Sequence, residues 1–336
     1  MQGNFRTIVV MLAVLLAPFA AKADPQKLKL AMFSADTEMT WVAAIKPWAD
    51  AVNKAGAGIV AIDEYPNGAL GRALPQQAQM VLDGVADIAF VIPGVTPGRF
   101  PDNEVMDLPG LFRNIREATL VYTRLMDRHV IRGFDDYYVL GAMGTTPFEI
   151  DSRAKITSLA DLKSKKIRVT NASQAQTLKT LGAVPVLMPV PEVPEAIGRG
   201  TIDGATEFPG PLYDFGIDRV TKYDYRINVG VSSLTLLMNR KVFDGLTPQA
   251  QAILRQYSGQ WYANVFITGY GKYVDDLWAK MKADPSRVIV SPTKADQAAM
   301  EAASKATIDE WIKKDLHNSD LLKAVQAEIV KVRGGS

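Results

Sequence analysis

The sequence predicts an α/β protein built from two similar lobes. Segments typical of strands and of helices alternate along the chain, which favours mostly parallel sheets covered by helices. A Gly-x-x-Asp pattern followed by a strand occurs twice, in LDGVADIAF (82–90) and in GRGTIDGAT (198–206), each time after a helix of similar length. At 336 residues the chain is also longer than one usual domain, so two lobes are expected.

The first part of the chain predicts alternating strands and helices. Strands are expected at 28–33, 58–66 and 87–92, in short segments rich in apolar residues. Between the first two, apolar residues recur at helical spacing from Trp41 to Val52. Pro47 lies inside this pattern, so a kink in the helix is expected.

The second part repeats the alternation. Ser158 and Asp161 have the spacing of a capping box before the strand KKIRVT (165–170), and a helix and a further strand follow twice. A long helix is then expected over 247–284, with Thr247 as its N-cap.

Three glycines lie inside the long predicted helix. Gly259, Gly269 and Gly271 are poor helix formers, and they predict that the helix bends or breaks. After it the chain predicts a late strand and C-terminal helices. We therefore expect a first lobe over 24–146 to which later segments cross back, a second lobe over 147–240, and a segment 241–336 that packs on both.

The first residues are typical of a secretory signal peptide. Arg6 precedes an apolar run from Ile8 to Ala20, and Ala21-Lys22-Ala23 has the form of a cleavage site before Asp24. A membrane anchor is the competing interpretation, which Pro18 disfavours. The sequence therefore predicts a leader over residues 1–23 and a secreted protein.

Charge and composition exclude several classes of function. Removal of the leader takes Arg6 and Lys22 and no acid, which leaves the basic residues in balance with the 36 acidic ones. Nucleic-acid binding normally needs a basic excess, so no nucleic acid is expected. The chain has no cysteine and two histidines far apart, His129 and His317, so no metal site and no cofactor is expected. Motifs of common hydrolases and nucleotide-binding enzymes are missing, so the sequence does not support an enzymatic function.

Arg168 stands out as a charge on the short strand KIRV. Ile167 and Val169 point to one face and Arg168 to the other. Its partner is either a protein carboxylate or water, or an anionic ligand held by the planar guanidinium. From these residues alone both interpretations stay open.

Apolar and aromatic residues follow several predicted strands. Phe33 follows the first strand, Ile92-Pro93 follows the third, Phe148 lies in TTPFEI, and Phe208 follows DGATE. Ligands bind outside the carboxyl ends of strands in open parallel sheets. These residues are therefore candidates for the walls of a ligand site.

Several segments together resemble a known family. YPNGALG, DGVADIAF and SLADLKSKKIRVTNASQAQTLKTLGAVPVLMPVPEVPEAIGRGTIDGA, in this order, are similar to the signature regions of the DctP-type substrate-binding proteins of tripartite ATP-independent periplasmic (TRAP) transporters. The resemblance implies a two-lobed periplasmic binding protein fold of type II-like architecture, with a long helix that braces both lobes. It also implies a periplasmic, non-enzymatic receptor, expected to be a monomer, whose partners are a small organic acid and the small and large permease subunits.

The resemblance also assigns a role to Arg168. In the family, the arginine of the KIRV segment clamps the carboxylate of the ligand. Sialic-acid binders of the family have a second arginine where this chain has Pro147 or Phe148, and an asparagine where it has Phe208. Polar residues of those binders are replaced by Phe33 and by Ile92-Pro93. One arginine among aromatic walls suits an apolar or aromatic monocarboxylate.

The full set of expected ligand contacts contains nine residues, and no catalytic residue is expected. A sensory module that reports to a receptor kinase, and a secreted enzyme on the same fold, are the alternative functions. The expected contacts are Arg168, Phe208, Phe33, Phe148, Ile92, Pro93, Glu207, Trp41 and Tyr213.

Overall fold

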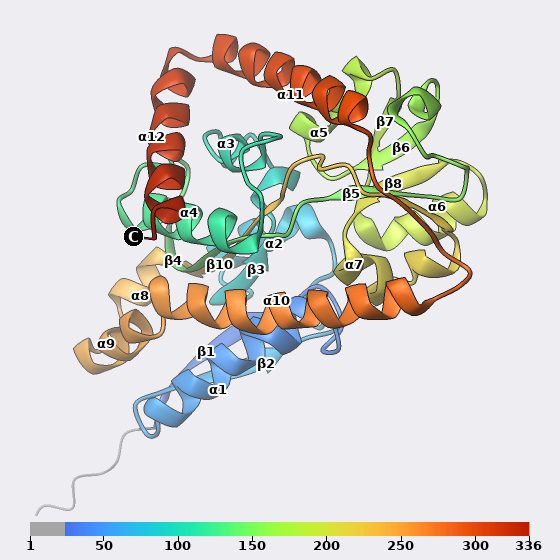
Figure 1. Ribbon diagram of the computed structural model, residues 1–336. Helices are drawn as coiled ribbons and strands as arrows, with labels where there is room; N and C mark the ends of the chain where they lie inside the picture. Colours follow the sequence, from blue (N-terminus) through green and yellow to red (C-terminus); the bar gives the residue numbers. More distant parts are fainter. Residues whose placement is uncertain (1–23, 336) are drawn as a thin grey trace, which may run out of the picture.

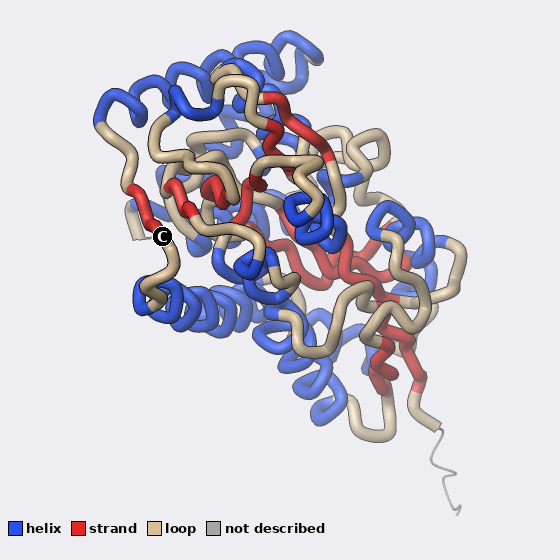
Figure 2. Tube along the Cα trace, turned by 90° about the vertical axis from the view of Figure 1, so that its right-hand side faces the viewer, coloured by secondary structure: helices blue, strands red, loops and turns tan. Residues whose placement is uncertain are grey.

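The computed structural model describes residues 24–335 as two α/β lobes, each built around its own sheet. The signal peptide expected over residues 1–23 lies outside the described residues. Figure 2 shows the strands in two separate groups with helices around them. The two-lobed fold predicted from the sequence is confirmed.

The first sheet has five strands in the order β2-β1-β3-β10-β4. β1 is parallel to β2 and β3, whereas β10 is antiparallel to both β3 and β4. The strands are β1 (Gln26–Ala31), β2 (Val60–Tyr65), β3 (Ile88–Val91), β4 (Tyr137–Gly144) and β10 (Ser233–Asn239). Every residue of β10 is buried, since helices cover both faces of the sheet.

The second sheet has six strands in the order β11-β9-β5-β8-β6-β7. β6 is parallel to β7 and β8, and β5 is antiparallel to β8 and β9. The strands are β5 (Glu149–Ser152), β6 (Lys166–Val169), β7 (Val184–Leu187), β8 (Gly204–Glu207), β9 (Tyr223–Tyr225) and β11 (Val288–Val290).

The α-helices cover the sheets, and three of them also connect the lobes. α10 spans both lobes and packs on η1 of the first and on α7 of the second, while α11 lies against α5 of the second lobe and α12 against α4 of the first (Figure 1). The helices are α1 (Lys46–Ala55), α2 (Gln77–Leu82), α3 (Glu104–Asp107), α4 (Ile115–Asp127), α5 (Ala172–Thr180), α6 (Val193–Gly198), α7 (Pro209–Asp214), α8 (Arg240–Asp244), α9 (Pro248–Gln256), α10 (Gln260–Ala283), α11 (Lys294–Lys314) and α12 (Leu316–Arg333).

Short helical turns complete the fold. One of them is a π-helix, η1 (Trp41–Ile45), which leads directly into α1. The 3₁₀ turns are η2 (Leu74–Gln76), η3 (Pro93–Val95), η4 (Leu159–Leu162), η5 (Val190–Glu192) and η6 (Ile217–Arg219). The capping box expected at Ser158 and Asp161 is present at the start of η4.

Residues 233–239 belong to a different lobe from the one expected. This segment is expected in the second lobe from the sequence, but it forms β10, between β3 and β4 of the first sheet. The chain crosses from the first sheet to the second over 145–148 and returns over 226–232. The two crossing segments are hydrogen-bonded to each other, with Phe148 N donating to Gly230 O at 2.8 Å and Val229 N donating to Phe148 O at 3.0 Å.

The helix irregularities predicted at Pro47 and at the three glycines have different outcomes. Pro47 lies at the start of α1, directly after η1, and its missing N–H cannot continue the helical hydrogen-bond pattern. The irregularity predicted there appears as the π-helix that precedes it. Gly259, with φ +55°, separates α9 from α10, so the predicted break occurs there. Gly269 and Gly271 lie inside the continuous α10, and the break predicted at them is wrong.

Gly269 has a packing role instead. A Cβ placed on it would lie 2.4 Å from the carbonyl oxygen of Ala43 in η1, so glycine allows α10 to approach the first lobe closely. A Cβ on Gly271, two residues further along α10, would meet no atom within 4 Å.

These two glycines give a matched test of α10 packing. We expect Gly271→Ala to raise the free energy of unfolding by up to about 1 kcal/mol, because alanine is the better helix former. Gly269→Ala has the same gain in helix propensity but forces the added methyl group onto Ala43, and we expect it to be less stable than the wild type. Urea unfolding of both variants measures the difference. Equal stabilisation by both substitutions would contradict the close contact.

Candidate ligand-binding site

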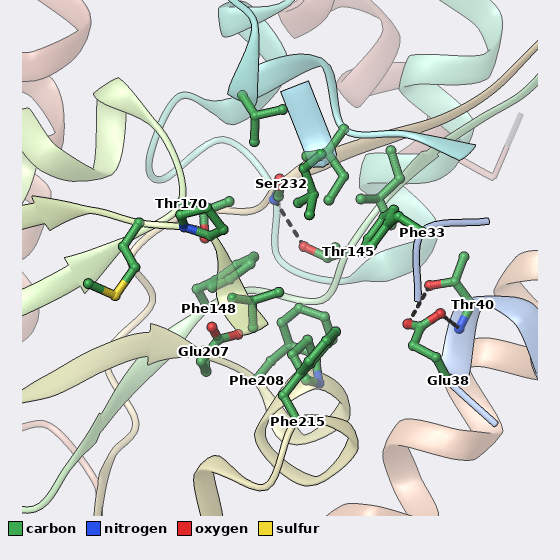
Figure 3. Close-up of a pocket in the computed structure, with 18 of the residues that line it drawn as sticks. Phe33, Glu38, Thr40, Thr145, Phe148, Thr170, Glu207, Phe208, Phe215 and Ser232 are labelled. Atoms are coloured by element: carbon green, nitrogen blue, oxygen red, sulfur yellow. Dashed lines mark hydrogen bonds between the residues drawn. The ribbon is translucent and has the colours of Figure 1, made fainter. Parts of the chain in front are cut away.

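A cavity of about 210 Å³ lies between the two lobes. Its walls come from strand ends of both sheets, from the crossing segments and from α10. Phe33 follows β1, Arg168 belongs to β6, Glu207 ends β8, and Tyr270 projects from α10. Figure 3 shows the side chains of Phe33, Phe148, Phe208 and others around this space.

Aromatic and aliphatic side chains form most of the wall. The ring of Phe148 meets that of Phe208 edge to face, with centroids 5.0 Å apart and an angle of 82° between the ring planes. Phe33 stacks on Phe90 with centroids 5.8 Å apart. Tyr270 lies 6.1 Å from Phe208, centroid to centroid. These contacts hold the rings in place, so the wall is preformed and suited to a flat apolar group.

Arg168 is the only base among the described residues that line the cavity, and it is 3% exposed. Its Nη1 donates to a carboxylate oxygen of Glu207 and to the carbonyl oxygen of Thr206 at 3.4 Å. Its Nε donates to the carbonyl oxygen of Met188 at 2.9 Å. No described residue accepts a hydrogen bond from Nη2, so this edge of the guanidinium is available to a bound anion.

Burial disfavours the charged form of both partners of this ion pair. Burial raises the pKa of Glu207 to about 7, and the charge of Arg168 opposes that rise. Burial likewise lowers the pKa of Arg168, which starts so high that the guanidinium stays charged. The pair therefore keeps one permanent positive charge in an apolar cavity, next to an acid that titrates near neutral pH.

A second buried acid, Glu38, lies on the other side of the cavity from Glu207 (Figure 3). Its carboxylate accepts hydrogen bonds from Thr40 N at 3.0 Å, Thr40 Oγ1 at 3.0 Å and Trp41 N at 3.3 Å. Burial raises its pKa to about 7, against the effect of these donors.

Hydroxyl groups from the crossing segments complete the polar part of the wall. Thr145 Oγ1 accepts a hydrogen bond from Ser232 N at 3.0 Å, and Thr145 N donates to Ser232 O at 3.0 Å. The hydroxyl oxygens of Ser232 and Thr170 are buried without a partner among the described residues. Both residues line the cavity.

Six of the nine expected contacts lie in the cavity wall, namely Arg168, Phe208, Phe33, Phe148, Ile92 and Glu207. The other three lie outside its lining. Trp41 points into the core of the first lobe, and Pro93 begins η3 behind Ile92. Tyr213 instead contacts Lys280, whose Nζ lies over its ring, 4.0 Å from the centroid.

Several wall residues were missed by the sequence analysis. Glu38 and Thr40 lie in the loop after β1, between the expected contacts Phe33 and Trp41. Tyr270 lies in a helix far along the chain, and Ser232 was assigned to a second-lobe strand. The one local signal for Glu38 was its place in TEMTW, just before η1. The N-cap residue of η1, Thr40, makes no capping hydrogen bond with its side chain.

The family profile described as "Bacterial extracellular solute-binding protein, family 7" (DctP) matches residues 31–315. This chain belongs to that family. The resemblance to DctP-type binding proteins of TRAP transporters is thereby confirmed. The family consists of solute-binding receptors and not of enzymes.

Relatives of this DctP-family chain include a protein from Escherichia coli strain K12 named as the 2,3-diketo-L-gulonate-binding periplasmic protein. It is 26% identical, over 95% of this chain and 97% of its own length. The solved structures include a marine metagenome TRAP solute-binding protein described as specific for aromatic acid ligands, in complex with metahydroxyphenylacetate. It is 27% identical with a TM-score of 0.85, over 91% of this chain and 99% of its own.

A second solved structure, of a TRAP solute-binding protein from Rhodoferax ferrireducens T118 with copurified benzoate, is 26% identical. Its TM-score is 0.82, over 92% of this chain and 99% of its own. In residues 24–335 no helix is long and apolar enough to cross a membrane. The same residues contain no group of three or more His, Cys, Asp or Glu side chains arranged to hold a metal ion.

The two buried acids of the cavity predict how stability changes with pH. Glu38 and Glu207 have folded-state pKa values raised to about 7, so between their ordinary values and about pH 7 the folded state holds protons that the unfolded state releases. Stability is then greatest at low pH in this window and falls as pH rises through 7. We expect the melting temperature without ligand to be higher at pH 5.5 than at pH 8.0.

Two variants distinguish the contribution of the cavity acids to this pH dependence from that of other acids. Glu38→Gln removes one of the two titrating groups, so the difference in melting temperature between the two pH values should shrink. Glu117→Gln is the control, because Arg333 holds the pKa of Glu117 below its usual range and outside this window. A melting temperature that rises from pH 5.5 to pH 8.0 would contradict the raised pKa values.

Proposed function

We propose that this chain is the extracytoplasmic receptor of a TRAP transporter and binds an aromatic monocarboxylate in the cavity between its lobes. The observation that carries the proposal is the single guanidinium of Arg168, set in a wall of aromatic rings. A guanidinium supplies one strong site for one carboxylate, and the rings supply a flat apolar surface for the remainder of the ligand.

The charges of the cavity favour one carboxylate over two. Arg168 is already paired with Glu207, and Glu38 adds a second acid on the opposite side. A ligand with two carboxylates would bring more negative charge than one guanidinium offsets. Like charges held close in a buried site disfavour one another strongly.

The size of the cavity favours a small ring. At about 210 Å³ it is below the roughly 300–1,000 Å³ typical of sites for drug-sized ligands. The solved relatives with metahydroxyphenylacetate and benzoate, each at least 26% identical to this chain, support an acid with one aromatic ring. Long or highly hydroxylated acids fit neither the volume nor the apolar wall.

The place of the receptor in transport follows from the family. We infer that the mature protein is periplasmic, works as a monomer, and passes its ligand to the small and large permease subunits. The periplasmic name of the Escherichia coli relative supports this location. A secretory leader over residues 1–23 would direct the chain there.

Ligand identity can be tested with a panel of carboxylic acids. We expect benzoate-type acids to raise the melting temperature of the purified protein, because a ligand that binds only the folded state stabilises it. Succinate and sialic acid should have little effect, since the cavity has one cation and few polar groups. Stabilisation by succinate or sialic acid, without an effect of any aromatic acid, would overturn the proposed ligand class.

The role of Arg168 can be tested by Arg168→Lys. Lysine keeps the charge and loses the planar fork, so we expect affinity for the cognate acid to fall at least roughly tenfold, measured by calorimetry. Arg226→Lys is the matched control, because Arg226 pairs with Glu149 outside the cavity lining. If Arg168 served only to pair with Glu207, the substitution would lower stability and leave the dissociation constant unchanged.

A further inference from the structure

The polar groups of the cavity are divided between two sides. Arg168 and Glu207 belong to strands of the second sheet, whereas Glu38 and Thr40 follow β1 of the first. Figure 3 places Glu207 and Glu38 on opposite sides, with Phe208 and Phe215 between them. A ligand carboxylate bound at Arg168 would therefore direct the remote half of its ring, which carries the meta and para positions, toward Glu38.

Glu38 retains capacity to accept a further hydrogen bond. A carboxylate has two oxygens and about four lone-pair sites. Oε2 accepts two hydrogen bonds, from the backbone N–H groups of Thr40 and Trp41, while Oε1 accepts one, from the hydroxyl of Thr40. Oε1 is thus the oxygen with an unused lone pair, and Glu38 lines the cavity.

The contacts with Thr40 and Trp41 also give Glu38 a structural role at the start of η1. This role needs an acceptor for two backbone N–H groups, which an uncharged amide oxygen also provides. A buried carboxylate is a costly choice for that purpose, since burial works against its charge. The negative charge at the cavity wall is therefore left to be explained by the ligand.

We propose that Glu38 is a specificity-determining residue, which accepts a hydrogen bond from a hydroxyl group on the ligand ring and excludes a second carboxylate. The inference rests on the proposed binding of an aromatic monocarboxylate at Arg168. It narrows that class to hydroxylated aromatic acids, with the hydroxyl on the part of the ring remote from Arg168.

The neighbours of Glu38 strengthen the exclusion of anions. Asp214, on α7, lies near enough to raise the pKa of Glu38, and Tyr262 and Tyr270 of α10 face it as neutral side chains. None of these groups carries positive charge. A second ligand carboxylate at this side would meet negative charge without a compensating cation, whereas a neutral hydroxyl would find an acceptor.

The experiment compares three probes of the same ring: benzoate, 3-hydroxybenzoate and benzene-1,3-dicarboxylate. For the wild-type protein we expect 3-hydroxybenzoate to bind about tenfold tighter than benzoate, the effect of one hydrogen bond to a charged group. Benzene-1,3-dicarboxylate should bind at least about tenfold more weakly than benzoate. Calorimetry at pH 8.0, where Glu38 is ionised, gives all three dissociation constants.

The variant Glu38→Gln should change the order of these ligands. Its amide oxygen can accept from Thr40 N and Trp41 N, which turns the NH₂ group to the place of Oε1. A donor then replaces an acceptor at the cavity wall, so affinity for benzene-1,3-dicarboxylate should rise about tenfold, and the advantage of 3-hydroxybenzoate over benzoate should shrink. Glu117→Gln, a change of the same type outside the cavity lining, should leave all three constants unchanged.

The outcomes distinguish this inference from the proposed function. If benzoate binds through Arg168 but the three ligands keep the same relative affinities in Glu38→Gln as in the wild type, the role of Glu38 is wrong and the proposed function stands. If none of the three ligands binds the wild-type protein, the proposed function fails and the inference fails with it. The melting temperature of Glu38→Gln reports whether the structural role at η1 is retained.

Discussion

The buried ion pair of Arg168 and Glu207 is the interaction on which the site depends. A guanidinium that is 3% exposed needs a counter-charge and acceptors for its N–H groups, and it has Glu207 and the carbonyl oxygens of Met188 and Thr206. The parallel pairing of β6 with β8 places Arg168 beside Ala205, so the sheet itself sets the position of both charges. A pair of this kind adds little net stability, because desolvation offsets the attraction. Its value is a fixed, oriented cation whose Nη2 edge remains available.

The second constraint is the way in which the lobes are held together. α10 packs on η1 of the first lobe and on α7 of the second, and Gly269 permits its close approach. Asp214 of α7 joins the same three parts, because it accepts hydrogen bonds from Met39 N and from the hydroxyl of Tyr273, both at 3.0 Å. The cavity is thus bounded by elements whose relative position is set by direct contacts among all three.

Local sequence patterns predicted the fold class, the family and the strand that carries Arg168, because alternation, capping and ordered motifs are properties of neighbouring residues. They also predicted that Phe33, Phe148 and Phe208 follow strand ends, where the structure places them in one wall. They missed that residues 233–239 return to the first sheet, since strand order depends on pairing between distant segments. Glu38 was missed for the same reason: a loop residue reaches the cavity only once η1 and α10 have packed. Trp41 was expected in the site, yet its helical position turns it into the core.

The crossing segments have a geometric consequence. Thr145 and Ser232 lie on the two segments that cross between the sheets, and they also form part of the cavity wall. If one lobe turned relative to the other about these two segments, a ligand in contact with them would lie close to the axis of rotation. Points near an axis of rotation move little, while the exposed rim residue Leu187, 62% accessible, would sweep a much longer arc. The residues near Thr145 and Ser232 would keep their positions while the entrance near Leu187 opens or closes. Ligand contacts near the axis would therefore stay unchanged while the access of ligand to the cavity changes.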